Sequence, residues 1–512
     1  MIRLQHLRFG FLSPSFIVYV TLGSSVLFFI TLCIYRRFFH PLAKFPGPVA
    51  ASLTEIWKWR SILSGRHPFD LQELHEKYVS REGTPDKNQF PGDVMRVAPD
   101  ELSFASVQAF RDIYGHKTTG KERFLKSDAY DNEEPRVSSV RDPTVHASQR
   151  KALSHAFSAR ALRDQEDVVH EYVDLLIKQL ANFGAGGLKP INVTDAYNWL
   201  TFDAIGDLSF GEPFGALESG SNQWVKLVLD SVITQGLESR FKKWPWLKLF
   251  IRLLLGSRKM QEWKKNSAEY TTLSREKARK RMEMGDSLKR QDFFGHLIKK
   301  GEVGQEYLVG NAQLLLAAGS ETTATSLVGT TWYLLKNQDC LRKLTDEIRG
   351  TFTMMDEITG DSTARCQYLH GVIEEGLRLF PPVASGLPRV SPGALVDGQY
   401  VPAGYVVACE TYSLARDPRY WVNPGSFLPE RWVGQGFGDD KRAFQPFSNG
   451  PHACLGSNLA YLELRITFAK IIFAYDLELV SQDIEDWNRA CSSLGLWRKP
   501  ALLVKFHPRK FA

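Results

Sequence analysis

The chain has 512 residues, of which 43% are hydrophobic and 24% charged; these ordinary values exclude disordered, collagen-like and coiled-coil classes for the bulk of the protein. Its six cysteines share no tight spacing, so neither a disulfide scaffold nor a paired-cysteine zinc site is expected. The formal net charge of +7 suits acidic partners or a membrane surface, but no concentrated basic stripe indicates a nucleic-acid binder.

The N-terminal segment contains a long uncharged stretch. No charged residue occurs from Phe9 to Tyr35, a run of 27 residues, and about 20 apolar residues suffice to cross the core of a bilayer. The alternative is a cleaved signal peptide. It is disfavoured because the run exceeds a signal's apolar region and Arg36-Arg37 follow it instead of small residues. We therefore expect a short N-terminal segment (1–15) and a single-pass transmembrane anchor (16–35).

The segment after the anchor is basic and rich in proline. Residues 36–48 contain two arginines, one lysine and three prolines, which predicts a stiff hinge between the anchor and a globular body. Basic residues flank both ends of the anchor, so the charge rule for membrane orientation leaves its direction open.

Prolines divide the body into two regions. None occurs between Pro245 and Pro381, whereas eight lie from Pro381 to Pro429. Because proline interrupts helices, the first region is expected to be helical and the second to consist of turns and short strands. Helical periodicity is found in residues 145–180, 305–335 and 370–380, and short strand-like runs flank a Pro-Asp turn within 93–104. These patterns predict one large, mainly α domain with a minor sheet.

The motif with the clearest chemistry lies near the C-terminus, in the segment Phe447-Ser-Asn-Gly450-Pro-His452-Ala-Cys454-Leu-Gly456. A cysteine in a glycine-containing loop just before a helix has its thiolate favoured by the helix N-terminus and nearby N–H groups. The glycines allow tight turns and the close approach of a flat ligand. Such a thiolate suits a haem iron, although a single cysteine without this context is more often a buried, inert thiol.

Two upstream segments add to this interpretation. In Ala318-Gly319-Ser320-Glu321-Thr322-Thr323, hydroxyl side chains can bond back to helix carbonyls, and Glu321 with Thr322 can relay protons. The alternative is an ordinary polar patch on a buried helix. Further on, Glu375 and Arg378 lie three residues apart, so they can pair on one face of a helix, which by itself is a common surface arrangement.

Together these segments resemble the cytochrome P-450 family, whose cysteine loop reads FxxGxRxCxG. Every fixed position matches except that His452 takes the place of the arginine. The hexapeptide beginning at Ala318 is similar to the family's oxygen-activation motif at every position. The resemblance covers residues 46 to about 505. Phrases at 40–48, 100–104 and 124–128 are most similar to those of fungal secondary-metabolism members.

The resemblance implies a role for each matching residue. Cys454 is expected to be the axial ligand of the haem iron, with Glu321 and Thr322 managing protons. Glu375, Arg378 and Arg431 are expected to form a structural network that supports the cysteine loop. The expected cofactor contacts, with the haem propionates or the haem face, are Arg150, His146, Arg389, His452, Phe447, Gly450, Gly456, Ala318 and Gly319. Arginine suits propionates because it pairs with carboxylates through two hydrogen bonds.

The same resemblance implies an activity. Residues 49–512 are expected to form a haem-thiolate monooxygenase that inserts one oxygen atom from O2 into a lipophilic small molecule by hydroxylation or epoxidation. The expected setting is a tailoring step in fungal terpenoid or polyketide metabolism. Two alternatives stay open. One is a haem-thiolate isomerase or dehydratase that needs no reductase, and the other is a haem-binding sensor or carrier without turnover.

Cofactors, partners and location follow from this expectation. They are haem b, O2, and NADPH through a cytochrome P-450 reductase, with cytochrome b5 as a further candidate, and no nucleic acid. The catalytic domain is expected on the cytosolic face of the endoplasmic reticulum. Substrate contacts are expected at residues 113–130, 239–256, 383–387 and 492–497, and the aromatic segment 244–250 is a candidate for dipping into the membrane.

Overall fold

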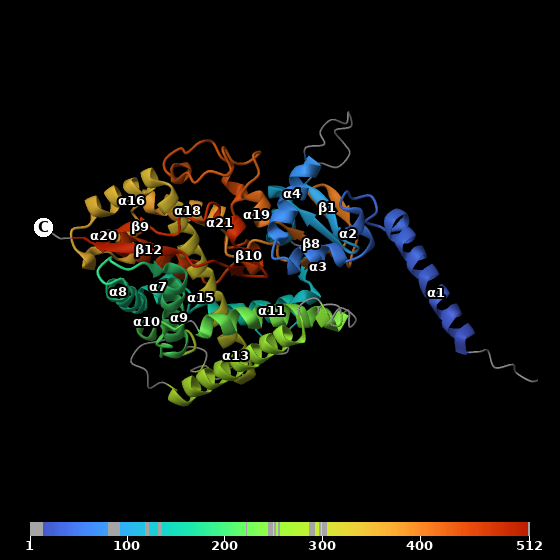
Figure 1. Ribbon diagram of the computed structural model, residues 1–512, viewed down its shortest axis with the longest axis horizontal. Coiled ribbons are helices and arrows are strands. Elements are labelled where there is room, and N and C mark those ends of the chain that lie inside the picture. The colour runs from blue at the N-terminus through green and yellow to red at the C-terminus, as the bar shows by residue number, and fades with distance from the viewer. Residues whose placement is uncertain are drawn as a thin grey trace, which may run out of the picture.

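The computed structural model describes residues 14–509, except for 80–92, 118–121, 132–135, 222, 244–248, 250–251, 254–255, 286–291, 296–297 and 299–304. Figure 1 shows a mainly helical body from which one N-terminal helix, α1, extends away. Of the four segments expected to contact substrate, 239–256 therefore lies half outside the described residues, and so does most of the 244–250 part expected to dip into the membrane.

Helices make up most of the body. The longer ones are α4 (His67–Val79), α6 (Pro143–Ser154), α8 (Glu166–Phe183), α9 (Val193–Phe210), α11 (Gln223–Lys243), α13 (Ser257–Met284), α15 (Gln305–Lys336), α16 (Gln338–Thr351), α18 (Gln367–Leu379) and α20 (Ser457–Ala474). The shorter ones are α2 (Val49–Leu53), α3 (Ile56–Leu63), α5 (Val107–Tyr114), α7 (Ala159–Arg163), α10 (Ala216–Ser219), α17 (Gly360–Thr363), α19 (Thr411–Leu414) and α21 (Trp487–Ala490). The helices expected at 305–335 and 370–380 are confirmed, and the 145–180 region is divided among α6, α7 and α8.

The strands form several small sheets; β1 and β8 lie on the side of the body from which α1 extends, and β9 and β12 lie beside α20 (Figure 1). The largest has the order β1-β2-β8-β5-β3, formed by β1 (Val94–Ala98), β2 (Glu101–Phe104), β8 (Val406–Cys409), β5 (Arg389–Val390) and β3 (Leu125–Lys126). The others are β4-β12-β9 (Ile191–Asn192, Leu503–Pro508, Tyr475–Leu479), β6-β7 (Ala394–Val396, Gln399–Val401) and β10-β11 (Ser492–Ser493, Trp497–Arg498). The predicted strands on either side of Pro99-Asp100 are confirmed as the antiparallel pair β1 and β2.

Helix α15 is the central element of the core. It is buried along most of its length, with polar as well as apolar side chains in the interior, and packs against α9, α13, α18 and α20. Its approach to α18 is close: a β-carbon at Gly376 would lie 1.9 Å from Thr330 Oγ1. Glycine is therefore required where α18 crosses α15. The large hydrophobic core joins these helices to α8 and α16.

The N-terminal apolar helix runs directly into the body. Helix α1 (Pro14–Ile34) continues as a π-helical turn, Tyr35–Phe39, and within the described residues one span, Val18–Phe39, is long and apolar enough to cross a membrane, with none of it buried. The proline-rich segment that follows packs against the body. Leu42 and Phe45 are buried, and the Arg96 N–H donates to Pro46 O at 2.6 Å. The boundaries 15/16, 35/36 and 48/49 stay predictions.

Candidate active site

A cavity of about 390 Å³ lies between α15 and the start of α20. Its wall on the α20 side is the loop that carries Cys454, and its opposite wall is the middle of α15. Ten of the residues singled out in the sequence line it: His146, Arg150, Ala318, Gly319, Thr322, Arg389, Phe447, His452, Cys454 and Gly456. Glu321 is absent from this lining, although its neighbour Thr322 is part of it.

The cysteine loop presents Cys454 to the cavity. The Cys454 N–H donates to Phe447 O at 2.8 Å, which closes the loop three residues before α20 begins at Ser457. Burial raises the pKa of the Cys454 thiol, whereas a hydrogen bond from the Gly456 N–H and the charge of Arg150 lower it. Two contacts therefore favour the thiolate. In the absence of a metal, burial raises the pKa of the thiol by more than these contacts lower it.

Glycine is needed at the two loop positions for different reasons. Gly450 has φ +71°, and a β-carbon there would lie 2.1 Å from Tyr114 O, so this position serves packing against α5. Gly456 has no atom within 4 Å of such a β-carbon and lines the cavity. Gly456 therefore leaves open space where a flat ligand can approach the backbone.

Cations gather on one rim of the cavity. Strand pairing places Lys126 of β3 opposite Arg389 of β5, and Arg150 of α6 donates to Ala453 O at 2.6 Å. None of the three forms an ion pair with a carboxylate in the described part of the chain. Burial and the charges of Arg389 and Arg150 lower the pKa of Lys126 to about 7. Such crowding of unpaired positive charge favours an anionic ligand.

Two histidines complete this rim. His452 Nδ1 and His146 Nε2 are 3.2 Å apart, and their ring centroids are separated by 4.2 Å. Burial and the neighbouring cations lower the pKa of His146 to about 4, and burial with the His146 ring lowers that of His452 to about 3. Both rings are therefore neutral hydrogen-bonding groups. His452, which stands where the family has arginine, adds a hydrogen-bonding position but no charge.

The donor set fits haem. A thiol faces an apolar cavity from one side. The rim offers two neutral imidazoles and three cations whose charges are not balanced by a carboxylate of the described residues. Two propionates supply such anions, and a tetrapyrrole plane matches the flat approach that Gly456 leaves open. Lys126 was not selected from the sequence as a site residue; its pairing with Arg389 across two short strands became visible only in the fold.

The middle of α15 shows the predicted back-bonding. The Thr322 hydroxyl donates to Ala318 O at 2.5 Å, and the Ser320 hydroxyl donates to Leu316 O at 2.5 Å. The helix itself is continuous from Gln305 to Lys336. At Gly319, a β-carbon would lie 2.6 Å from Ile205 Cδ1, so glycine here allows α9 to pack closely.

The Glu321 carboxylate points away from the cavity that Thr322 lines. It is buried and forms an ion pair with Lys499, which follows strand β11. The Thr325 hydroxyl also donates to Glu321 Oε1 at 3.3 Å. An acid and an alcohol that are neighbours in sequence thus lie on different sides of α15.

A buried carboxyl that the sequence reading missed also lines the cavity. Glu463 of α20 is 4% exposed, and its Oε1 has no hydrogen-bond partner among the described residues. Burial raises the pKa of Glu463 to about 8, opposed by a hydrogen bond with Thr323. Its place within an apolar helix gave no sequence signal for a cavity position.

Replacing Glu463 should change how stability depends on pH. The carboxyl titrates near 4.5 when exposed and near 8 in the fold, so the unfolded state releases its proton first as pH rises. The wild type therefore loses stability from about pH 4.5 to about pH 8, whereas Glu463→Gln does not, and at pH 8 the variant should be more stable by about 1–3 kcal/mol. Urea unfolding across this range measures the difference, with the exposed Glu485→Gln as control. Parallel pH profiles for wild type and Glu463→Gln would contradict the prediction.

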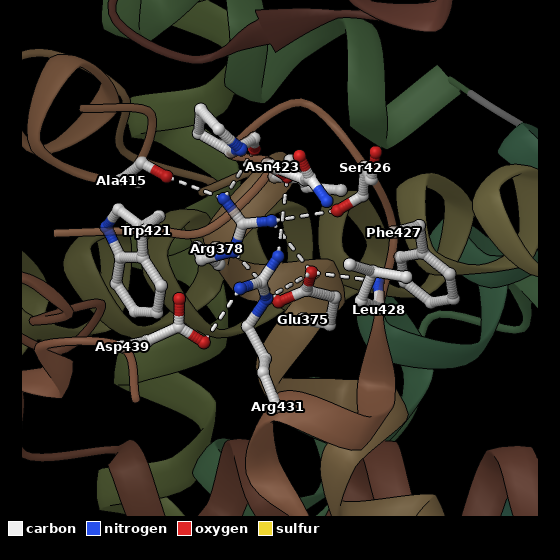
Figure 2. A network of polar contacts seen from close by, with 12 residues as sticks. Glu375, Arg378, Ala415, Trp421, Asn423, Ser426, Phe427, Leu428, Arg431 and Asp439 are labelled. Atoms are coloured by element: carbon white, nitrogen blue, oxygen red, sulfur yellow. Dashed lines mark hydrogen bonds and ion pairs between the residues drawn. The ribbon is translucent and has the colours of Figure 1, made fainter. Parts of the chain in front are cut away.

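A buried polar network lies between α18 and residues 415–439 (Figure 2). Glu375, Arg378 and Arg431 are each fully buried. Glu375 accepts from Arg378 Nη2 at 2.7 Å and from Arg431 Nε at 3.0 Å. Arg431 also pairs with Asp439 at 2.8 Å. The structure thus brings together the three side chains selected from motifs more than 50 residues apart.

The network joins α18 to the segment that leads into the cysteine loop. Arg378 donates to three backbone carbonyls, those of Ala415, Pro424 and Ser426. The Leu428 N–H and the Trp432 indole donate back to Glu375. Each buried charge is therefore matched by hydrogen bonds, as burial of ions requires.

Comparison with known proteins agrees with this geometry. The chain matches the family model for Cytochrome P450 over residues 87–504. Among similar proteins, the cytochrome P450 monooxygenase BOA3 of Botryotinia fuckeliana (strain B05.10) is 39% identical over 487 residues, covering 92% of each chain. The cytochrome P450 monooxygenase btcC of Colletotrichum orbiculare is 35% identical over 500 residues, 94% of this chain and 92% of the relative. The chain therefore belongs to the cytochrome P450 family and is a haem-dependent monooxygenase.

Membership establishes the general chemistry. The cofactor is haem b, O2 is a co-substrate, and electrons originate from NADPH and arrive through a reductase. The other reactant is a small molecule. The family fold, expected from the sequence, is confirmed by the match and by the helical body with small sheets.

Proposed function

We propose that Cys454 is the axial ligand of the haem iron. The observation that carries this assignment is a thiol open to an apolar cavity whose rim holds cations that pair with no carboxylate among the described residues. Haem bound through a cysteine thiolate supplies an iron whose ligand donates electron density and favours O–O cleavage.

We also infer which groups position the haem. Arg150, Arg389 and Lys126 would bind its propionates through charge-assisted hydrogen bonds, with His146 and His452 adding neutral contacts. The side of the cavity near Cys454 would be shaped by Phe447, Gly450 and Gly456. The side formed by α15 would be shaped by Ala318 and Gly319. Glu375, Arg378 and Arg431 would hold the segment before the cysteine loop and touch no reactant.

The proton-handling residue on the cavity wall is proposed to be Thr322. Its hydroxyl donates its single hydrogen to Ala318 O, so the Thr322 oxygen can accept a hydrogen bond from the cavity side and would pass a proton on after turning away from Ala318 O. The overall reaction, RH + O2 + NADPH + H⁺ → ROH + H2O + NADP⁺, takes one proton from solvent. Glu321 is proposed as the carboxylate that supplies it.

Replacing Thr322 tests this role. In Thr322→Ala the hydroxyl that positions protons at the cavity is lost, so reduced oxygen should leave as H2O2 (NADPH + H⁺ + O2 → NADP⁺ + H2O2). Peroxide released per NADPH consumed should rise severalfold with the reductase present, while haem content stays at the wild-type level. Thr322→Ser restores the hydroxyl and serves as control. An unchanged peroxide share in Thr322→Ala would show that Thr322 has no such role.

We propose a lipophilic secondary metabolite, of terpenoid or polyketide type, as substrate and a tailoring hydroxylation or epoxidation as the reaction. A second lobe of about 190 Å³ shares Thr322, Leu387 and Cys454 with the main cavity and is also lined by Phe110, Leu377 and Val383. These apolar side chains favour a weakly polar ligand. The lobe reaches the 383–387 segment that the sequence selected for substrate contact.

The partner is proposed to be NADPH–cytochrome P450 reductase, with cytochrome b5 as a second electron donor. Exposed basic side chains on the cysteine-loop side support the docking of an acidic flavoprotein there; they are Lys151, Arg160, Lys441 and Arg442.

We propose a location in the endoplasmic reticulum membrane, with the body in the cytosol where NADPH is available. Turnover that depends on NADPH separates this function from an isomerase, dehydratase or carrier.

A further inference from the structure

The segment 383–387, which forms part of the second lobe of the cavity, contains neither helix nor strand. Val383, Ser385 and Leu387 of this segment line the lobe. The backbone N–H and C=O groups of such a segment have no regular ladder to bond to, so partners elsewhere in the chain must fix them. The shape of this wall of the lobe therefore depends on those partners.

The residues that follow strand β8 supply several of these partners. The Thr411 hydroxyl donates to Ala384 O at 3.1 Å, and the Tyr412 N–H donates to the same carbonyl at 3.2 Å. The Glu410 carboxylate accepts from the Gly386 N–H at 2.8 Å. Thr411 lines the second lobe, whereas Glu410 is absent from its lining. Glu410 thus holds the segment from behind, on the side away from the lobe.

The contact with Glu410 is made where the segment passes closest to β8. A β-carbon at Gly386 would lie 2.6 Å from Cys409 O and 2.9 Å from Ala408 Cβ, so glycine is required at this crossing. Glycine also has more backbone freedom than any other residue. An anchor on its N–H therefore restrains the segment at the position where it would otherwise move most.

Glu410 is a buried carboxylate supported by hydrogen bonds. It is 5% exposed and forms no ion pair with a cation in the described part of the chain. Its second oxygen accepts from the Ser103 hydroxyl at 3.3 Å, and Ser103 Oγ lies 2.9 Å from His75 Nε2. Keeping a carboxylate in the interior without a paired cation costs free energy. Such a group beside a ligand cavity is a candidate for a functional role.

The charge of Glu410 changes near neutral pH. Burial raises the pKa of Glu410 to about 7, and hydrogen bonds from the Gly386 N–H and the Ser103 hydroxyl oppose this shift. The other titratable groups around it are Lys58 of α3, His75 of α4, Glu101 of β2, Tyr114 of α5 and Cys409 of β8. Lys58 and Glu101 form an ion pair with each other.

We propose that Glu410 is a positioning residue for the substrate: its carboxylate holds the Gly386 N–H and thereby fixes the 383–387 segment against which the substrate packs. The inference rests on the proposed substrate contact at 383–387 and adds the group that sets its shape. A hydrogen bond to an ionised carboxylate is roughly twice as strong as one to a neutral group. A bulky ligand therefore meets a preorganised segment when Glu410 is ionised, and must order the segment itself when Glu410 is neutral.

Hydrogen exchange of the haem-loaded protein measures the segment directly. Glu410→Gln keeps the shape of the side chain but removes its charge, so peptides covering 383–387 should exchange severalfold faster than in the wild type at about pH 8, where Glu410 is ionised. The matched control is Glu374→Gln. Glu374 is also a buried carboxyl with a pKa of about 7, but it accepts from Tyr461 of α20 at 2.6 Å. Its replacement should leave exchange at 383–387 unchanged.

Ligand selectivity gives the second readout. Pyridine and 3-phenylpyridine bind haem iron through the same kind of nitrogen, and the phenyl ring adds a part that extends into the cavity. The ratio of their affinities, from optical difference spectra, cancels effects on the iron itself. In the wild type this ratio should shift severalfold in favour of 3-phenylpyridine from about pH 6 to about pH 8, as Glu410 ionises. Glu410→Gln should keep the low ratio at both pH values.

Ser103→Ala keeps the test open if Glu410→Gln does not fold. It removes one hydrogen bond that favours the ionised carboxylate, so the rise in the affinity ratio should move to higher pH. A rise at the wild-type pH in Ser103→Ala, or a rise that persists in Glu410→Gln, would assign the titration to another group and overturn the inference.

The remaining outcomes separate the inference from the proposed function. Unchanged exchange or an unchanged affinity ratio in Glu410→Gln overturns the positioning role, while a thiolate-type carbon-monoxide spectrum of that variant leaves the haem assignment standing. Leu387→Ala alters the wall of the lobe itself. An affinity ratio that is also unchanged in Leu387→Ala overturns the proposed substrate contact at 383–387 and the inference with it.

Discussion

Replacing Cys454 with alanine should abolish the reaction of this monooxygenase. The variant removes the proposed iron ligand from the wall of the main cavity, and with it the electron donation of a thiolate. We expect NADPH-dependent product formation to fall by at least about a hundredfold, since the ligand's push on O–O cleavage is lost. Haem content, measured on the purified protein, should fall as well, because only the propionate contacts remain.

Cys409→Ala is the matched control for this variant. Cys409 is fully buried beside the second lobe of the cavity, and its Sγ contacts Ser106 O at 3.5 Å. Losing it should leave haem binding and the iron's spectrum unchanged. Full haem content and turnover in Cys454→Ala would contradict the assignment.

The second large effect is expected at Glu375. Glu375→Gln removes the charge that balances Arg378 and puts an amide among donors from Arg378, Arg431, Leu428 and Trp432. Breaking a buried ion pair in this way costs about 3–5 kcal/mol of unfolding free energy. Because the network joins α18 to the segment before the cysteine loop, we expect haem to be retained poorly. Urea unfolding of the haem-loaded protein measures the loss.

Glu430→Gln distinguishes this effect from the loss of any glutamate. Glu430 lies near the same segment but pairs with Lys343 at 2.6 Å, where the two side chains are 32% and 46% exposed. Such exposed pairs contribute only about 0–1 kcal/mol. Equal losses of unfolding free energy in Glu375→Gln and Glu430→Gln would show that the buried network contributes no more to stability than an exposed ion pair.

Much of the cavity could be predicted because its residues stand in fixed local motifs. Each of these motifs is complete within a few consecutive residues. They are the cysteine loop, the Ala318–Thr323 segment, and the pair Glu375 and Arg378. The proline distribution likewise separated the helical region from the short strands. In each case a local pattern was enough, since turns, caps and helix faces depend on neighbours in sequence.

The residues that the sequence missed are placed by long-range packing. Lys126 meets Arg389 through two-residue strands that have no pattern of their own. Lys499 reaches Glu321 from a segment 178 positions away. Glu463 looked like one more polar residue in an apolar helix. The direction of Glu321 likewise depends on the distant Lys499, so the simple acid–alcohol pair expected from sequence has its two members on different sides of α15.

The most direct test of thiolate ligation by Cys454 is the carbon-monoxide difference spectrum of the dithionite-reduced protein, compared between wild type and Cys454→Ala. Ligation by Cys454 predicts the red-shifted Soret band of a thiolate-bound haem in the wild type and its absence from the variant. A wild-type band at the position of a histidine-ligated haem in folded protein, or a red-shifted band that persists in Cys454→Ala, would contradict it.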